Sequence, residues 1–511
     1  MSKLYVISIG GSGTRVLKAL TMLLAAGMKS EAEEIIPLVI DTDVHNGDLE
    51  YFRKLIKCYR QINQSFYRSM PSEIYPHGFF RTQIHTPKEL NISGSQYGTL
   101  GEMINYLSLN ASGMGDMKNL TDLLFSTSSR ELRLEHGFLG VPSIGSVVLR
   151  DVVESKGFKE FTQNFQPGDR IFIVSSIFGG TGAAGFPLLL NIFRDPQSGI
   201  SNAAYINNAI IGGISLQPYY DVDVDKFNKG ESPIDSNTFI TKTKAALSYY
   251  EKYLAQNLNA MFFIGESRKS NYPNNPGGKE QRNPACFLEL AAALSILKFM
   301  NYEKNAANKE QLDNNLKFFE FGISEDEVNL NLSHLGKTKD EIIRQLISFH
   351  YLATYMSLKF DNAVEDRHMV WKNDLKMPAN FNNSEIAKGF REFFDLHYYQ
   401  WLLQMGKSDH GRRFLPYNLR SRDSEEALLD FNKSVKMEVN DSEWFQLVNE
   451  IPAKKDSGWL NMSKDKIDLD EIFNASVIKV IENERLQNFE SRLIGLFNEG
   501  MSEFYTKRFL N

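Results

Sequence analysis

Short apolar runs alternate with helical segments along the N-terminal half of the chain. Each run is almost continuously hydrophobic, as expected of a parallel strand that is covered on both faces. The segments between them place apolar residues at helical spacing, and the first, from about Thr14 to Ala26, ends at Gly27. Five runs follow this pattern: 4–9, 35–40, 170–176, 209–214 and 260–264. The sequence therefore predicts an α/β fold with a doubly wound, mostly parallel sheet.

The pattern changes in two other parts of the chain. Residues 47–136 begin with a helical stretch, but they then become rich in Pro, Gly, Ser and Asn and are interpreted as a long irregular insertion. Asn283-Pro284 starts a segment that is apolar on nearly every side, which predicts a buried central helix over about 283–302. We expect one α/β domain over 1–305 and a mainly helical C-terminal domain over 306–511.

Composition narrows the class of protein. The chain has 511 residues, 42% of them hydrophobic, which is enough to bury a sizeable core. Its formal net charge of −6 provides no basic surface for nucleic acid or anionic lipid. The two cysteines form no CxxC pair, which fits a reducing compartment, and no apolar segment is long enough to cross a bilayer. We therefore expect a cytoplasmic protein with no nucleic-acid partner and no direct membrane insertion.

A glycine turn connects the first predicted strand to the first helix. Backbone N–H groups in such a turn can approach an anion closely, and the helix start adds partial positive charge. A tight strand-to-helix turn without a ligand is the alternative. The dinucleotide pattern GxGxxG is incomplete, because its third glycine position falls on Val16. The turn reads Gly10-Gly11-Ser12-Gly13-Thr14-Arg15.

A second glycine cluster follows the predicted strand at 170–176. Residues 179–185 read GGTGAAG, which suits a nest of N–H donors wrapped around a phosphate. The cluster is not a Walker loop, and the one near match, NLSHLGKT at 331–338, lacks its first glycine and follows no strand. Ligand loops lie at the carboxyl ends of parallel strands, so we expect both glycine turns to converge on one triphosphate.

The GGTGAAG segment is similar to the GGTG(S/A)G signature of the tubulin and FtsZ superfamily. The order of the other elements over about 3–305 also resembles that family. IDTD resembles the NTD motif after the second FtsZ strand, GVPSIG lies where the family has its third phosphate loop, and SLQPYY lies where it has a sugar-contacting loop; these segments occupy 40–43, 140–145 and 215–220. The chain looks more like divergent bacterial tubulin-like proteins than like eukaryotic tubulin or division-type FtsZ.

The resemblance implies a site for GTP or GDP with Mg²⁺. Residues 11–13 would face the α- and β-phosphates, and residues 179–182 would grip the β- and γ-phosphates. Asp41 and Asp43 would lie near the γ-phosphate and Mg²⁺, although a pair of solvent-facing acidic residues is the alternative. The implied cofactor-binding residues are Gly10, Gly11, Ser12, Gly13, Arg15, Asp41, Asp43, Gly140, Gly145, Gly179, Gly180, Thr181, Gly182, Ala183 and Asn283.

Two of the implied contacts concern the base and the sugar of the nucleotide. Asn283 resembles the guanine-reading Asn of the family's central helix, but an Asn before Pro at a helix start is also a suitable N-cap. Asp221 and Asp223 are candidate ribose partners. The choice between guanine and adenine stays open at this point.

The resemblance also implies self-assembly. Family members complete hydrolysis in trans, because an acidic residue after the central helix of one subunit acts on the nucleotide of the next. A head-to-tail contact of this kind generates a filament when its rotation does not close. Glu303, Glu310 and Asp313 lie in the corresponding window, and Glu310 is nearest to the family's position. The main hypothesis is therefore a GTPase whose catalytic acid is Glu310 and whose partner is another copy of itself.

Other classes of protein stay open or are set aside. One alternative is a non-polymerising, nucleotide-dependent scaffold that binds a protein partner through its helical C-terminal region. A second is a Rossmann-type NAD-dependent oxidoreductase, which the incomplete GxGxxG disfavours. The nine histidines show no metal-ligand spacing, so no His/Cys metal site is predicted.

Overall fold

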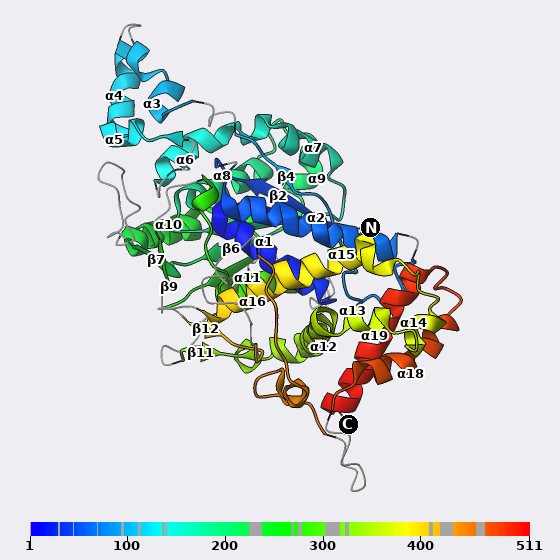
Figure 1. Cartoon of the computed structure of the whole chain (residues 1–511). Coiled ribbons are helices and arrows are strands. Elements are labelled where there is room, and N and C mark those ends of the chain that lie inside the picture. The colour runs from blue at the N-terminus through cyan, green and yellow to red at the C-terminus, as the bar shows by residue number, and fades with distance from the viewer. Residues whose placement is uncertain are drawn as a thin grey trace.

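The computed structural model describes most of the chain as an α/β sheet that continues into a helical C-terminal region (Figure 1). The described residues are 2–28, 31–43, 45–68, 70–92, 97–110, 114–134, 138, 141–223, 238–267, 270–273, 278–301, 317–321, 327–407, 412–419, 433–455 and 466–510.

The main sheet has eight strands, and its strand pairs are parallel. Its order is β10-β8-β6-β5-β1-β2-β3, with β4 also paired to β2. Chain order reverses between β1 and β5, as in doubly wound folds, so the predicted fold class is confirmed. The strands are β1 (Lys3–Ile9), β2 (Glu34–Ile40), β3 (Gln83–Ile84), β4 (Lys88–Glu89), β5 (Arg170–Ser176), β6 (Ile210–Leu216), β8 (Ala260–Ile264) and β10 (Lys317–Phe321).

The strand register brings the carboxyl ends of the central strands to one edge. Ile9, the last residue of β1, pairs with Ile40, the last residue of β2. Ser176 and Leu216, which end β5 and β6, are also partners. The turns that follow these four strands therefore start at the same edge of the sheet. This edge includes the point where the chain order reverses, between β1 and β5.

Helices cover both faces of this sheet. On β6, a Cβ added at Gly212 would touch Phe299 of α11, whereas one added at Gly213 would touch Phe186 of α8. Side chains of successive strand residues point to opposite faces, so α11 and α8 lie on different sides. The helices of the α/β region are α1 (Gly10–Ala25), α2 (Gly47–Tyr67), α6 (Pro142–Val148), α7 (Lys156–Asn164), α8 (Gly180–Arg194), α9 (Ala203–Asn207), α10 (Phe239–Tyr253) and α11 (Phe287–Met300).

The predicted central helix exists and is buried along nearly its whole length. It begins at Phe287, three residues after Pro284, because Cys286 rather than Asn283 takes the N-cap position. The first helix ends as its sequence indicates. Gly27 adopts a φ of +84°, and its N–H donates to the carbonyl oxygen of Leu24, which closes the helix.

Segment 47–136 is more regular than expected. Its first part, α2, is a 21-residue helix, and β3 and β4 extend the main sheet. Phe79 and Phe80, between α2 and β3, are buried in the body, whereas the described residues between 97 and 130 project from it in Figure 1 as short helices. One of them exposes a run of apolar side chains, including Met117, Leu120 and Leu123. The short helices are α3 (Leu100–Met103), α4 (Gly115–Leu124) and α5 (Thr127–Arg130).

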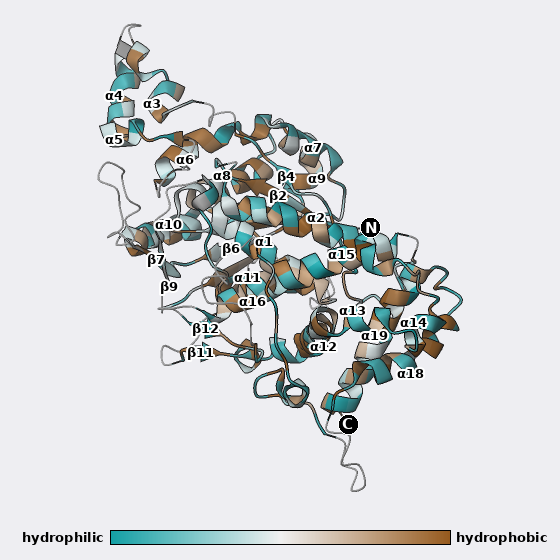
Figure 2. Ribbon diagram, viewed as in Figure 1, coloured by the Kyte–Doolittle hydropathy of each residue, from teal (hydrophilic) through white to brown (hydrophobic). Residues whose placement is uncertain are grey.

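The C-terminal region is helical, and aromatic side chains such as Phe349, Tyr355, Phe473 and Phe497 are buried in it. Hydrophobic and hydrophilic residues alternate along its helices in Figure 2. The main sheet reaches past residue 305, because β10 pairs with β8. Small two-stranded pairs, β7 (Tyr220–Asp223) with β9 (Ser270–Pro273) and β11 (Asn329–Leu330) with β12 (Arg413–Phe414), lie apart from the main sheet. The helices are α12 (Thr338–Leu358), α13 (Phe360–Glu365), α14 (Val370–Asp374), α15 (Glu385–Arg391), the π-helix η11 (Glu392–Tyr398), α16 (Tyr399–Gly406), α18 (Leu469–Ile481) and α19 (Phe489–Tyr505).

Within the described residues, no helix combines the length and the hydropathy that a membrane span requires.

Candidate functional site

The two glycine turns lie next to each other at the switch point of the sheet. Gly10 follows β1 and has a φ of +71°, a conformation that glycine adopts without strain. A Cβ added to it would lie 3.8 Å from Cβ of Thr181 at the start of α8. The turn after β1 and the turn after β5 therefore form one surface, although they are far apart in the chain.

Two of the glycines in these turns have a packing role that needs no ligand. A Cβ at Gly13 would lie 3.0 Å from Cα of Ser8 and from the carbonyl oxygen of Val174. A Cβ at Gly182 would lie 2.6 Å from the carbonyl oxygen of Ser176. Because both contacts are with backbone atoms, only glycine lets α1 and α8 approach the strands this closely. Gly13 and Gly182 thus set the positions of the two helix starts.

Both helices begin without a side-chain cap. Ile9 precedes α1 and Gly179 precedes α8, and neither residue bonds a helix N–H group through its side chain. By contrast, Asn46 caps α2 and Ser155 caps α7. The unpaired N–H groups and the positive ends of the helix dipoles favour an anion at the surface shared by α1 and α8.

The predicted third loop packs against α8. Gly145 lies inside α6, and a Cβ added there would be 2.7 Å from Cβ of Ala184 and 3.2 Å from the carbonyl oxygen of Gly180. Ala183 is buried in the same turn of α8. Gly140 lies outside the described residues. The start of α6 is thus next to the second glycine turn, and a phosphate contact from it stays a prediction.

The acidic turn after β2 is held by its own carboxylates. The Asp43 N–H donates to Oδ1 of Asp41 at 3.0 Å, and the His45 N–H donates to Oδ1 of Asp43 at 3.0 Å. The other oxygen of Asp43 accepts from the N–H of Gly278, in the segment before α11. Asp43 is buried and Asp41 is half-buried, so the alternative of two solvent-facing acids does not describe this pair.

The negative charge of the Asp41 carboxylate is poorly compensated by its surroundings. Burial raises its pKa to about 7, and the nearby carboxylates of Asp43 and Asp48 add to the increase. The hydroxyl of Thr42 is buried beside it and has no hydrogen-bond partner within the described part of the chain. A carboxyl group that lacks a cation suits a divalent metal ion.

Beneath these turns lies a cluster of four buried charges. The Arg15 guanidinium donates from Nε to Oε1 of Glu289 at 2.6 Å and from Nη1 to Oδ2 of Asp48 at 3.1 Å. Nζ of Lys18 lies 2.8 Å from Oδ1 of Asp48. These side chains are at most 4% exposed. Their formal charges cancel, and they join α1, α2 and α11. We call Arg15, Lys18, Asp48 and Glu289 the buried charge cluster.

The loop after β6 also reaches this cluster. Nη2 of Arg15 donates to the hydroxyl of Tyr219 at 2.6 Å and to Oγ of Ser12 at 3.3 Å, and the Tyr219 hydroxyl donates to Ser12 at 3.3 Å. The Arg15 side chain is therefore committed to protein partners in this structure. Contact of Arg15 with a cofactor stays a prediction, and so does contact of Ser12 with a cofactor.

The sequence analysis did not single out Lys18, Asp48, Glu289 or Tyr219. Two of them had a detectable signal. Lys18 is three residues from Arg15 and so shares its helix face. Glu289 is an acidic residue in a helix that is otherwise apolar nearly all round, which requires a buried cationic partner. Which cation pairs with it depends on how α1 and α11 are placed.

Asn283 lies beside the buried charge cluster. Its backbone N–H is 3.4 Å from Oδ2 of Asp48, and it lies four residues before the start of α11 at Phe287. Nearby, the Asn46 amide donates to Oε1 of Gln281 at 2.8 Å, so the segment before α11 packs on the start of α2. These contacts do not test whether Asn283 binds the guanine base of a nucleotide, which stays a prediction.

Several predicted residues fall outside this arrangement. Glu303, Glu310 and Asp313 lie outside the described residues, so the position of the proposed catalytic acid is not part of the structure. Asp221 is half-buried in β7, which pairs with β9.

Comparison with known proteins adds little. No family model matches the chain, and no curated protein matches its sequence. Among solved structures, the chain is similar to CetZ from Methanosaeta thermophila, with 11% identity and a TM-score of 0.25 over 61% of this chain and 57% of that one. It is also similar to CetZ2 from Haloferax volcanii, solved as a GTPγS-bound protofilament, with 12% identity and a TM-score of 0.30 over 61% and 62%. The chain thus matches less than two thirds of the length of either protein, and similarity at this level does not establish a family.

Replacing Lys18 with Met should destabilise the protein strongly. The variant leaves Arg15 as the single cation for Asp48 and Glu289, and breaking a buried ion pair costs about 3–5 kcal/mol. Lys388→Met is the matched control, because Lys388 pairs with Glu385 on the surface and should change stability by less than about 1 kcal/mol. Urea unfolding followed by circular dichroism measures both. Equal effects of the two substitutions would contradict the role of the buried charge cluster.

Asp41→Asn should change how stability depends on pH. The folded pKa of about 7 lies above the unfolded value of 3.8, so the folded state binds the extra proton and stability is lost as pH rises from about 4 to about 7. Asn keeps the acceptor oxygen but cannot ionise, so its free energy of unfolding should not fall in this way. The difference in free energy of unfolding between variant and parent should therefore increase by about 2 kcal/mol from pH 5 to pH 8, after allowance for solvent screening. Thermal melts across this range test it, with the exposed Asp374→Asn as control. Parallel pH profiles for parent and Asp41→Asn would be inconsistent with this assignment.

Proposed function

We propose that this chain is a nucleotide-binding protein of the tubulin and FtsZ type, which binds GTP at the carboxyl edge of its sheet. The observation that carries the proposal is that Gly10 and Thr181 are neighbours at the strand-order switch point, where a Cβ built on Gly10 would lie 3.8 Å from Cβ of Thr181. That is the place where doubly wound sheets bind ligands, and both turns there come from glycine-rich segments.

The phosphates would bind to the starts of α1 and α8. Gly10, Gly11 and Gly179 are half-buried rather than sealed, so their backbone N–H groups are accessible to a ligand. Thr181, also half-buried, adds a hydroxyl beside them. Two uncapped helix starts provide a fixed positive potential for a triphosphate without any lysine. The residues present therefore fit the group.

Asp41 and Asp43 would hold Mg²⁺ near the terminal phosphate. The raised pKa of Asp41, caused first by burial and then by Asp43 and Asp48, indicates a carboxyl group that a dication would stabilise in its ionised form. When bound, Mg²⁺ would offset charge on the phosphate oxygens. Guanine as the base, and Asn283 as its partner, rest on the resemblance of GGTGAAG and its neighbouring segments to the family.

Hydrolysis and assembly belong to the same proposal. Glu310 of one subunit would act at the nucleotide of the next, so that GTP turnover depends on a head-to-tail contact between copies. The alternative is a scaffold that binds nucleotide but does not polymerise. The C-terminal helices pack on α2 and on the segment before α11, both of which lie next to the proposed nucleotide site. In a scaffold, this packing would allow bound nucleotide to influence the C-terminal region that binds the partner. In this contact the Tyr51 hydroxyl donates to the carbonyl oxygen of Leu396 at 3.2 Å, and the Ala285 N–H donates to Gln404 at 3.0 Å.

Gly11→Asp should abolish nucleotide binding while leaving the fold intact. A Cβ at Gly11 meets only ordinary contacts of 3.7 Å, with side-chain atoms of Arg15 and Asn46, so the new side chain fits. Its carboxylate would repel the phosphates, and we expect affinity for GTP to fall by at least about 100-fold. Gly115→Asp, at the open start of α4, is the matched control. The measurement is the nucleotide that co-purifies with each full-length protein, followed by calorimetry with GTP, ATP and NAD. Unchanged GTP affinity in Gly11→Asp would refute the site, and tight binding of NAD alone would favour the oxidoreductase.

Sedimentation separates a filament from a scaffold. If the chain assembles head to tail, the parent protein should pellet with GTP and Mg²⁺ but not with GDP, and Gly11→Asp should stay in the supernatant under both conditions. Glu310→Gln should still pellet with GTP but release phosphate at least about 10-fold more slowly. A parent protein that binds GTP and stays in the supernatant at all concentrations supports the scaffold alternative.

A further inference from the structure

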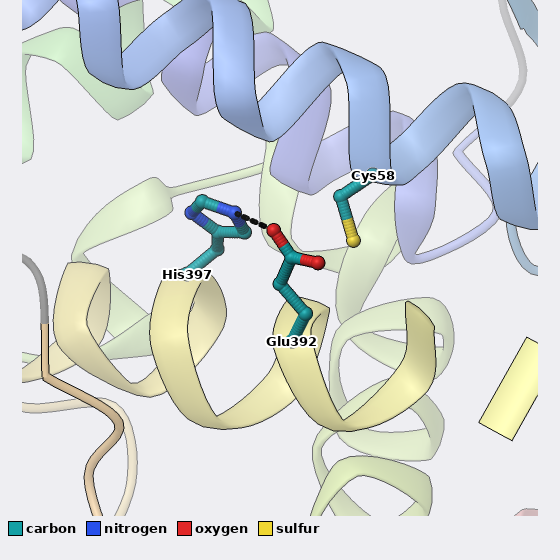
Figure 3. Close-up of side chains that lie close together, drawn as sticks. All are labelled: Cys58, Glu392 and His397. Carbon is teal, nitrogen blue, oxygen red and sulfur yellow. Dashed lines mark ion pairs between the residues drawn. The ribbon is translucent and has the colours of Figure 1, made fainter. Parts of the chain in front are cut away.

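Three potential metal ligands meet where α2 packs against the C-terminal helices. Cys58 comes from α2, and Glu392 and His397 come from the π-helix η11 (Figure 3). One ligand atom from each lies within 4.8 Å of the other two, and Nε2 of His397 is 4.0 Å from Oε1 of Glu392. In Figure 3 the three side chains point toward a common space between the two helices. Among the described residues, no other group of three potential ligands is this compact.

The π-helix is what places Glu392 and His397 side by side. Residues five apart in an α-helix point about 140° away from each other around the axis. Here the segment Glu392–Tyr398 is a π-helix between α15 and α16, in which hydrogen bonds join residues five apart and bring them to the same side. Single π-turns inside α-helices are frequently found at functional sites. The amino-acid sequence alone does not reveal this juxtaposition.

His397 points to a missing ligand. Its side chain is fully buried, yet neither ring nitrogen has a hydrogen-bond partner among the residues that the structure describes. Aromatic rings surround it, with the Tyr51 ring edge-on at a centroid distance of 5.0 Å. A buried polar ring without partners is costly, and a metal ion would satisfy it.

We propose that Cys58, Glu392 and His397 form a Zn²⁺ site that joins α2 to the C-terminal helical region. Thiolate, imidazole and carboxylate together are a donor set that suits Zn²⁺ and does not suit Mg²⁺ or Ca²⁺. Three protein ligands leave the fourth tetrahedral position to water. Glu392 is 49% exposed, which gives the ion and that water a route from solvent.

The geometry requires only a small adjustment. Tetrahedral Zn²⁺ with these donors needs ligand atoms about 3.4–3.6 Å apart, so the present separations, which reach 4.8 Å, must shorten by up to about 1.4 Å. The exposed side chain of Glu392 can supply part of that movement, and rotation of the Cys58 and His397 side chains must supply the rest. The Cys58 thiol now lies 3.3 Å from the carbonyl oxygen of Gly389 and would lose its proton to solvent when the metal binds.

The charges around the site are compatible with a dication. Glu392 and the Cys58 thiolate together carry two negative charges, which neutralise Zn²⁺. Of the cations that act on His397, Lys54 is exposed to solvent and Lys18 is paired with Asp48. Neither is therefore an uncompensated buried charge next to the metal. A bound ion would tie together two parts of the chain that are more than 300 residues apart in sequence, next to the buried charge cluster.

The test is Zn²⁺ binding to the full-length protein after treatment with a chelator. Titration against a chromophoric zinc indicator should show one tight equivalent in the parent. Glu392→Gln should weaken it by more than about 10-fold, since changes even to outer-shell partners of a metal cost that much. Because the Glu392 side chain is half-exposed and Gln has nearly the same shape, we expect this variant to fold as the parent does. Glu385→Gln, an exposed acid on the adjacent α15, is the control and should bind as the parent does.

A second measurement identifies the sulfur ligand. Co²⁺ added to the metal-free parent should give a thiolate-to-cobalt charge-transfer band, which Cys58→Ser should lose and Cys286→Ser should keep. Zn²⁺ should also raise the melting temperature of the parent but not that of Glu392→Gln. Failure to bind Zn²⁺, an affinity unchanged in Glu392→Gln, or a charge-transfer band that persists in Cys58→Ser would each overturn the proposal. None of these outcomes depends on GTP binding, so the proposed function stands or falls separately.

Discussion

The buried charge cluster is the interaction on which the functional edge of this protein depends. Arg15 and Lys18 on α1 neutralise Asp48 on α2 and Glu289 on α11, so three helices are joined by buried ion pairs. Burial alone would raise the pKa of Asp48, but Lys18 and Arg15 outweigh it and hold that pKa below its ordinary value. Such a cluster is stable only when complete, because each member left alone would be an uncompensated buried charge. It therefore fixes α1 relative to its neighbours, and with it the glycine turn.

A steric constraint acts together with this electrostatic one. Gly13 and Gly182 let the first turns of α1 and α8 touch the backbone of the central strands. The two helix starts consequently lie at the same edge, close enough for Gly10 to approach Thr181. Contact with a ligand is not needed to explain Gly13 or Gly182. A Cβ at the half-buried Gly10, Gly11 or Gly179 would meet side-chain atoms only, at 3.0 Å or more, so these glycines are not required by close backbone packing. Within one motif, some glycines thus build the site and others are left to contact a ligand.

The C-terminal helices are packed directly onto this α/β region. Tyr51 and Cys58, on one helix that starts at the buried charge cluster, both bond carbonyl oxygens of the C-terminal region. The π-helix η11 lies at this contact and directs His397 into it. The helix α2 therefore contacts both proposed sites: its N-cap Asn46 lies beside Gly11 at the glycine edge, and Cys58 belongs to the cysteine–histidine group.

The sequence by itself determined the parallel strands and the glycine turns. A continuous apolar run such as Leu4–Ile9 can be buried only on both faces, and a turn such as Gly10 needs a conformation that few other residues adopt. It could not show β3, β4 or β10, because two-residue strands carry no periodicity and β10 is largely exposed. Nor could it pair Arg15 with Glu289, or bring Cys58 to His397. Local patterns record burial and backbone conformation, but which distant charges and ligands meet is decided only when the helices pack.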